Sequence, residues 1–177
     1  ELAPFKKLIA SAKTDFIMTA HIQYPALDAS EIKTKTGSSI IKPATFSHKT
    51  VTRLLKQDMG YDGIVISDAL DMGAISQHFN PVEAVINTFA AGVDIALMPI
   101  QISSPRDIKK IKKLIDAIEL AVVEKQLDRD EIVESANKIM SFKNAKNRKR
   151  VRASALGANS DLINVSKSSS NKSSKNR

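Results

Sequence analysis

The stretch GYDGIVISDALDMGAI, Gly60–Ile75, places an acidic residue directly after a short and uniformly apolar run. Residues 63–67, GIVIS, show no polar alternation, which is typical of a strand that is covered on both faces in a parallel sheet. Gly60, just before the run, is a residue type with which helices commonly end. The pattern therefore predicts a helix, then a buried strand, with Asp68 at the carboxyl end of that strand.

Two further apolar runs have the same character, namely DFIMTAHI at 15–22 and VDIALMP at 93–99. Between and after them, apolar residues recur at helical spacing, which predicts helices over 2–13, 47–60, 81–92, 105–125 and about 128–145. We expect the helix over 2–13 to bury one face. In the helix over 105–125 the side expected to be buried carries Ile108, Ile111, Leu114, Ile115 and Ile118. This alternation predicts an α/β fold of repeated βα units around a parallel sheet.

Turn and cap residues support these boundaries. Ser47 is placed to cap the second helix, Pro81 and Gly92 bracket the third, and Asp128 with Glu131 has the spacing of a capping box. Residues 23–45 contain Pro, Gly and many Ser and Thr, so we expect a long irregular loop.

Composition restricts the class of protein. A chain of 177 residues with 42% hydrophobic residues is long enough for one globular domain, and it contains no Cys. The net charge is +8, but residues 143–177 hold ten Lys or Arg and a single Asp, so the rest of the chain carries about −1. We therefore expect a folded domain over 1–143 and a disordered basic tail over 144–177, so the net charge gives no reason to expect a nucleic-acid partner for the domain. No apolar run is long enough to span a membrane.

Polar residues lie at the expected carboxyl ends of the strands, where α/β folds place their ligand sites. His21 lies at the far end of the first run, after IMTA, and Asp68 follows the second run, GIVIS. Because strand ends are rigid and converge, a carboxylate there is well placed for catalysis. The alternative is that Asp68 only caps the following turn.

Three segments together resemble glycoside hydrolase family three, and within it the bacterial β-N-acetylglucosaminidases. These segments are IMTAHIQYPALD, PATFSHKTVTRLLKQDMGYDGIVISDALDMGAI and EAVINTFAAGVDIALMP, and the similarity runs from about residue 1 to 142. The resemblance implies that the chain is the last three βα units of a (β/α)8 barrel. It also implies a carbohydrate substrate and a retaining hydrolysis that removes terminal β-linked N-acetylglucosamine from cell-wall glycans or their breakdown products.

The resemblance further implies roles for particular residues. Asp68 matches the catalytic nucleophile, which forms a glycosyl-enzyme intermediate. Met18 and His21 match the strand that borders the sugar pocket, and Met72 matches a residue beside the nucleophile. The alternatives are that His21 is a hydrogen-bonded residue at a strand end and that Met72 is an ordinary packing residue. We expect no metal or nucleotide cofactor.

A retaining glycosidase also needs a group that protonates the leaving oxygen. In this subfamily that group is a His–Asp pair that follows a KHFPGHG-like segment, and neither is present in the chain. Three strands do not close a barrel, so we expect a fragment with unpaired sheet edges and little activity unless an upstream half of the barrel is supplied. A β-glucosidase of the same family, or a non-catalytic binding remnant, remain alternatives. The compartment stays open.

Overall fold

The computed structural model describes residues 2–148. The chain divides into two compact units, residues 1–136 and residues 137–177, which are considered separately. Residues 129–148 are helical, so helical structure continues five residues past the predicted boundary at 143. The rest of the predicted basic tail lies outside the described residues. No helix within residues 2–148 is long and apolar enough to cross a membrane.

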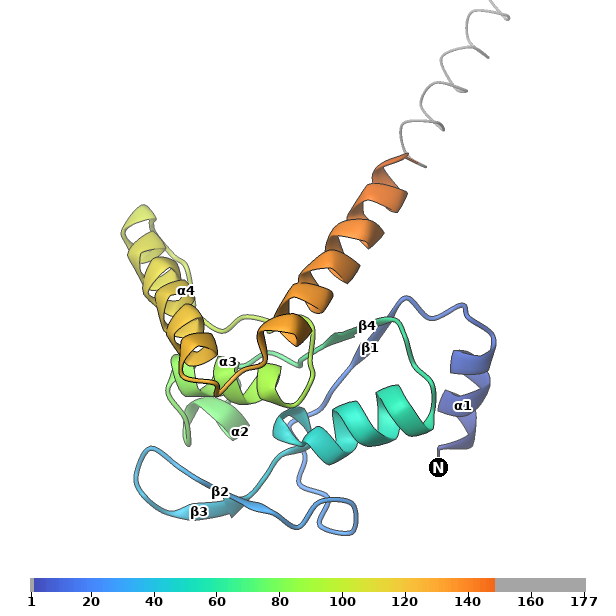
Figure 1. Ribbon diagram of the computed structural model, residues 1–177. Helices are drawn as coiled ribbons and strands as arrows, with labels where there is room; N and C mark the ends of the chain where they lie inside the picture. The colour runs from blue at the N-terminus through green and yellow to red at the C-terminus, as the bar shows by residue number, and fades with distance from the viewer. Residues whose placement is uncertain (1, 149–177) are drawn as a thin grey trace, which may run out of the picture. The chain divides into compact units, whose positions relative to one another are not determined.

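The described part of the first unit consists of helices and four short strands (Figure 1). In chain order its elements are α1 (Ala3–Ala10), β1 (Phe16–Met18), β2 (Glu31–Lys33), β3 (Ser39–Ile41), η1 (Ala44–Phe46), η2 (Lys49–Asp58), β4 (Ile64–Ile66), α2 (Gly73–Ser76), α3 (Pro81–Ala90), η3 (Pro105–Asp107) and α4 (Ile108–Val123).

The predicted parallel pairing is present between the first two apolar runs. β1 pairs with β4 in parallel, with Ile17 opposite Val65, and Ile66 forms a parallel bridge to Ile95 on the other side. The third predicted strand, 93–99, is therefore only one bridge long. The backbone ladder stops there because the Leu97 N–H donates to the side-chain oxygen of Ser67 instead of to a backbone carbonyl.

The prediction that both faces of the first strand are covered is wrong for β1. Phe16 is 40% exposed and Met18 is 55% exposed, whereas Val65 in the neighbouring strand is fully buried. Among the described residues β1 has β4 as its only strand partner. A strand with one neighbour is an edge strand. Phe16 and Met18, two residues apart, lie on one face of β1, and the described elements leave that face partly uncovered.

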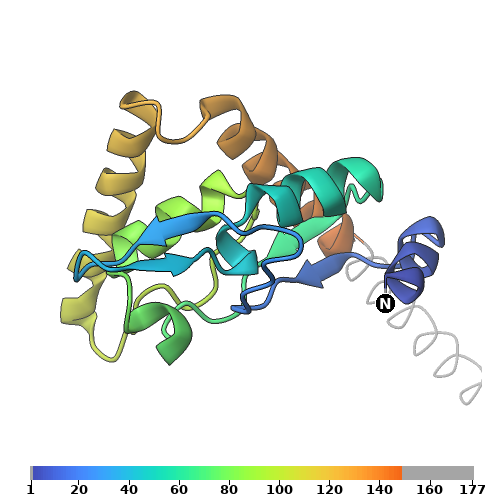
Figure 2. The same cartoon turned by 90° about the horizontal axis from the view of Figure 1, so that it is seen from below.

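The predicted irregular loop at 23–45 is also wrong, because it contains an antiparallel hairpin. β2 and β3 run side by side, with Ile32 opposite Ile40 (Figure 2). Gly37 supplies the positive φ of the turn between them, at 87°. Ile32 and Ile40 pack against the core, and the surrounding Ser, Thr and Pro masked their alternation in the sequence.

The helix ends were predicted well from cap chemistry. The Ser47 side chain accepts the Thr50 N–H at 3.1 Å at the start of η2, a π-helix, and Gly60 after it has φ 67°. In α3, Asn80 and Glu83 form a capping box ahead of Pro81. At the start of the last helical segment, the Asp128 carboxylate accepts the backbone N–H groups of Asp130 and Glu131.

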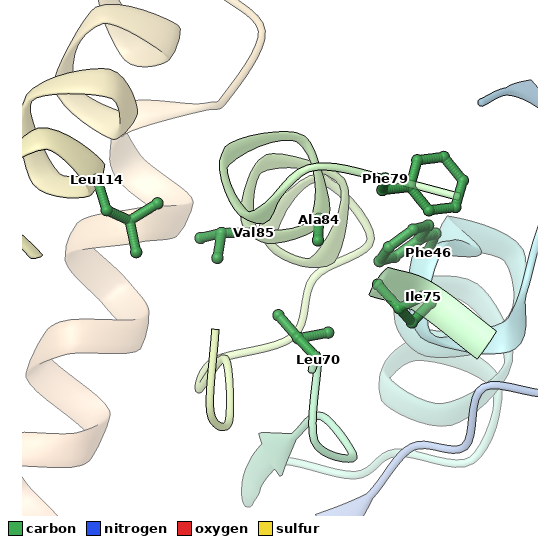
Figure 3. Close-up of a cluster of buried hydrophobic side chains, with 7 residues drawn as sticks. All are labelled: Phe46, Leu70, Ile75, Phe79, Ala84, Val85 and Leu114. Carbon is green, nitrogen blue, oxygen red and sulfur yellow. The ribbon is translucent and has the colours of Figure 1, made fainter. Parts of the chain in front are cut away.

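The larger hydrophobic core lies where α2, α3 and α4 meet the turn after β4 and the short helix η1 (Figure 3). The rings of Phe46 and Phe79 pack edge to face, with centroids 5.2 Å apart. Seven buried residues form this core: Phe46, Leu70, Ile75, Phe79, Ala84, Val85 and Leu114. A second core joins η2 to β4 and to residues 91–93, so that the segments on both sides of Asp68 are anchored.

Two predicted buried faces are exposed in the structure. On α4 only Leu114 of the predicted set is buried and Ile118 is partly buried, whereas Ile108, Ile111 and Ile115 are 59%, 40% and 50% exposed. On α1 no residue is buried. The periodicity was read correctly, but an apolar face becomes buried only where another element covers it.

Candidate active site

Asp68 lies immediately after β4, at the carboxyl end predicted from the sequence. Its carboxylate oxygen Oδ1 accepts the backbone N–H of Ala69 at 2.8 Å. The other oxygen, Oδ2, accepts no hydrogen bond from any described residue, and every buried polar side-chain atom in the described part of the chain has a partner. Oδ2 is therefore accessible to solvent. One oxygen is therefore anchored, whereas the other has no partner in the described residues.

Ser67 fixes the backbone of Asp68. It is fully buried, and its N–H donates to the Ile95 carbonyl at 2.9 Å. Its hydroxyl donates to the Asp68 carbonyl at 2.7 Å and accepts the Leu97 N–H at 2.9 Å. The residue that carries the candidate nucleophile is thus held from the neighbouring parallel segment as well as from its own strand.

A buried carboxylate, that of Asp94, accepts a hydrogen bond from the backbone of β4. Asp94 is 5% exposed, and it accepts the Val65 N–H at 2.7 Å, the Ser135 hydroxyl at 2.6 Å and the Lys56 ammonium group at 3.2 Å. These contacts tie the strand to η2 and to the helical residues that follow 128. Sequence analysis did not single out Asp94, since its position just inside an apolar run gives no sign of these partners.

His21 and Asp68 are brought together by the parallel pairing of β1 and β4. The imidazole Nε2 of His21 lies 2.9 Å from the carbonyl oxygen of Ala69, the residue after Asp68. The other ring nitrogen, Nδ1, lies 2.9 Å from the Thr45 hydroxyl. Both ring nitrogens are therefore engaged within the protein, as in the alternative interpretation of His21 as a hydrogen-bonded residue.

Thr45 is a further residue of the site that sequence analysis missed. It is fully buried, and its hydroxyl lies 3.0 Å from the Thr19 hydroxyl and 3.1 Å from the Ala20 carbonyl as well as near His21. It comes from η1, inside the segment that was predicted to be irregular. Nothing local marks this threonine among its neighbours, because its role depends on β1 lying alongside.

The two methionines occupy different surroundings. Met18, at the end of β1, lines an apolar groove of about 300 Å³ together with residues of α1 and η2, such as Phe5 and Leu54. Met72 is 46% exposed and stands just before α2, where its carbonyl accepts the N–H groups of Ile75 and Ser76. The substrate-binding roles of both residues stay predictions.

Two relatives of the chain carry the name hexosaminidase. The chain is 45% identical over 143 residues to Beta-hexosaminidase A of Pseudoalteromonas piscicida, an alignment that covers 81% of this chain and 24% of that protein. It is 35% identical over 126 residues to Beta-hexosaminidase LpqI of Mycobacterium tuberculosis, which covers 68% of this chain and 29% of that protein.

Solved structures give the same picture. A glycoside hydrolase family 3 β-N-acetylglucosaminidase from Paenibacillus matches with a TM-score of 0.64 and 30% identity, over 81% of this chain and 24% of that one. The β-N-acetylglucosaminidase from Thermotoga maritima matches with a TM-score of 0.61 and 27% identity, over 78% and 27% of the two chains.

The chain thus spans about a quarter of the length of these relatives. Residues 1–141 match the family model of the glycosyl hydrolase family 3 N terminal domain. This match and the similarity to the relatives above show that the chain belongs to glycosyl hydrolase family 3.

Proposed function

We propose that this chain supplies the nucleophile, Asp68, of a retaining glycosidase that removes terminal β-linked N-acetylglucosamine. The single observation that carries the proposal is the geometry of the Asp68 carboxylate, with Oδ1 held by the Ala69 N–H and Oδ2 accessible. A nucleophile needs an oriented carboxylate with one oxygen available to the anomeric carbon. The names of the hexosaminidase relatives support the choice of sugar.

In the first step Oδ2 attacks the anomeric carbon, the glycosidic C–O bond breaks, and the leaving oxygen takes a proton from a general acid. In the second step water attacks the same carbon, the bond to Asp68 breaks, and the water proton passes to the group that acted as the acid. Two displacements at one carbon return the original β configuration.

The acid is proposed to come from another part of the barrel. Within residues 2–148 no histidine forms an ion pair or a hydrogen bond with a carboxylate, so the described residues offer no His–Asp pair of the kind that the resemblance implies. The described sheet has two parallel strands and one bridged segment, which is too few to close a barrel. We propose that the remaining strands complete the barrel against β1 and that the chain alone has little activity.

The test uses Asp68→Ala in the full-length protein with an aryl β-N-acetylglucosaminide. We expect release of the aryl alcohol to fall by at least 10³-fold and to recover partly with azide, which attacks the anomeric carbon in place of the missing carboxylate, displaces the aryl oxygen and gives an α-glycosyl azide. Asp71→Asn is the matched control, because Asp71 is a half-buried carboxylate of the same turn that accepts from Gln101. Undiminished turnover of Asp68→Ala would remove Asp68 from the role.

A parallel assay with the matching aryl β-glucoside tests the sugar. We expect the N-acetylglucosaminide to be the better substrate by kcat/KM. A preference for the glucoside would replace the proposed substrate by that of a β-glucosidase while leaving the role of Asp68 intact.

A further inference from the structure

We propose that His21 is a positioning residue that orients the Asp68 carboxylate through Ala69 and does not contact the sugar. The proposal rests on the proposed role of Asp68 as the nucleophile.

Ala69 links the two side chains directly. Its N–H donates to Asp68 Oδ1 at 2.8 Å, and its carbonyl lies 2.9 Å from His21 Nε2. A carbonyl oxygen only accepts hydrogen bonds, so Nε2 carries a proton and donates it. The protonation of one ring nitrogen is thereby assigned by the geometry.

The peptide group between Ala69 and Leu70 is held at both ends. Its carbonyl accepts from His21, and its N–H, that of Leu70, donates to the Leu97 carbonyl at 2.9 Å. The turn after Asp68 is therefore hydrogen-bonded on one side to the segment that follows β1 and on the other side to Leu97. If His21 is lost, this peptide is held at its N–H end alone, and Ala69, whose own N–H anchors Oδ1, loses one of the contacts that fix its backbone.

The imidazole is itself held in place. Thr45, fully buried, faces Nδ1 at 2.9 Å and is tied to Thr19 and Ala20 on the same segment as the histidine. The one proton of the Thr45 hydroxyl lies within reach of both Nδ1, at 2.9 Å, and the Ala20 carbonyl, at 3.1 Å, so the contact fixes the place of the ring without assigning a donor at Nδ1. Because both nitrogens are engaged, the ring has no polar atom left for a sugar hydroxyl.

These contacts predict which kinetic constant changes. A misplaced nucleophile weakens interactions made in the transition state, so kcat falls while KM for the substrate stays nearly constant. A direct sugar contact would instead raise KM. We expect His21→Asn to lower kcat roughly 10- to 100-fold in the full-length protein.

Conservative variants identify the contact that matters. A glutamine amide nitrogen reaches about as far as imidazole Nε2, whereas an asparagine nitrogen reaches only as far as Nδ1. We expect His21→Gln to keep most of the kcat of the native protein, whereas His21→Asn shows the full loss. Thr45→Val, which keeps the shape but removes the partner of Nδ1, should lower kcat less than His21→Asn and add nothing to it in the double variant. Thermal melts monitor folding of each variant.

The azide reaction separates this inference from the proposed function. Once the carboxylate is removed, His21 has nothing to position, so Asp68→Ala and Asp68→Ala/His21→Asn should give the same azide-dependent rate. A slower double variant, a KM that rises with kcat unchanged, or equal kcat for His21→Gln and His21→Asn would each overturn the role of His21. If Asp68→Ala forms no glycosyl azide and keeps its turnover, the proposed function itself fails.

Discussion

Asp28 is a buried carboxylate that anchors the start of η2. It is 5% exposed, and it accepts the Ser47 hydroxyl at 2.6 Å, the Ser30 hydroxyl at 2.7 Å and the Lys49 ammonium group at 3.1 Å. Burial acts to raise the pKa of Asp28, but hydrogen bonds from Ser47, Ser30 and Lys49 outweigh it and hold the pKa well below its usual range. The ionised form therefore favours the folded state.

We predict that Asp28→Asn lowers the free energy of unfolding by about 2 kcal/mol at pH 7, because charge-assisted hydrogen bonds are lost. A lowered folded pKa gives stability that is present above the unfolded pKa, about 3.9, and is lost as the pH falls toward the folded pKa. The difference in free energy of unfolding between the native protein and Asp28→Asn should therefore become smaller below about pH 4. Urea unfolding at several pH values between 7 and 2.5 measures it.

Asp130→Asn is the control for that series, because the side chain of Asp130 is 96% exposed. We expect it to change the free energy of unfolding by less than about 0.5 kcal/mol at every pH. A difference between native protein and Asp28→Asn that stays constant down to pH 2.5 would show that the charge of Asp28 does not stabilise the fold.

At the scale of elements, the position directly after α3 favours glycine for two independent reasons, the backbone conformation and the space available. Gly92 has φ 93°, and a Cβ on it would collide with Thr52 Oγ1 of η2. Gly37 in the hairpin turn has a similar φ of 87° but open space around it. Substitution of Gly37 would introduce backbone strain alone, whereas substitution of Gly92 would introduce backbone strain and a steric collision.

We predict that Gly37→Ala costs about 1 kcal/mol of unfolding free energy from backbone strain alone, and that Gly92→Ala costs at least about 1 kcal/mol more because of the collision. Urea unfolding of both variants checks this ordering. Adding Thr52→Ala, which itself removes a hydrogen bond to the Ala91 carbonyl, should reduce the extra cost in a double-mutant cycle. Equal costs for the two glycine variants would contradict the close approach of α3 and η2.

Elements were predicted from sequence to different degrees. The run GIVIS became β4, and Ser47, Gly60 and Pro81 marked helix ends where expected, since capping depends on residues a few positions apart. The β2–β3 hairpin was missed because its strands have three residues each and its turn residues also suit a loop. Periodicity is a weak signal over so few residues.

At the scale of the whole molecule, the described residues expose apolar faces on β1, α1 and α4. An edge strand offers unpaired backbone groups to other chains, and uncovered apolar side chains add to this tendency. In the proposed barrel these surfaces are covered by the remaining strands and helices. Alone, the chain should associate with itself.

We predict that the 177-residue chain self-associates at micromolar concentration and that Met18→Lys, at the end of β1, reduces the association. Val123→Lys adds the same charge on α4, at a side chain that is 77% exposed, and should reduce it less. Sedimentation velocity measures the distribution of species. An equal effect of the two substitutions would mean that the edge of β1 is not the main contact.

The sequence by itself determined the positions of the longer helices, most helix ends and the place of Asp68 after a buried strand, because these follow from periodicity and from contacts between near neighbours. Only the tertiary structure decided which apolar faces are covered and which side chains meet at the site. His21 contacts Thr45 across 24 residues of chain and Ala69 across 48, and the contact with Ala69 depends on the pairing of β1 with β4. Burial and long-range hydrogen bonds are properties of the packed molecule, so no local pattern specifies them.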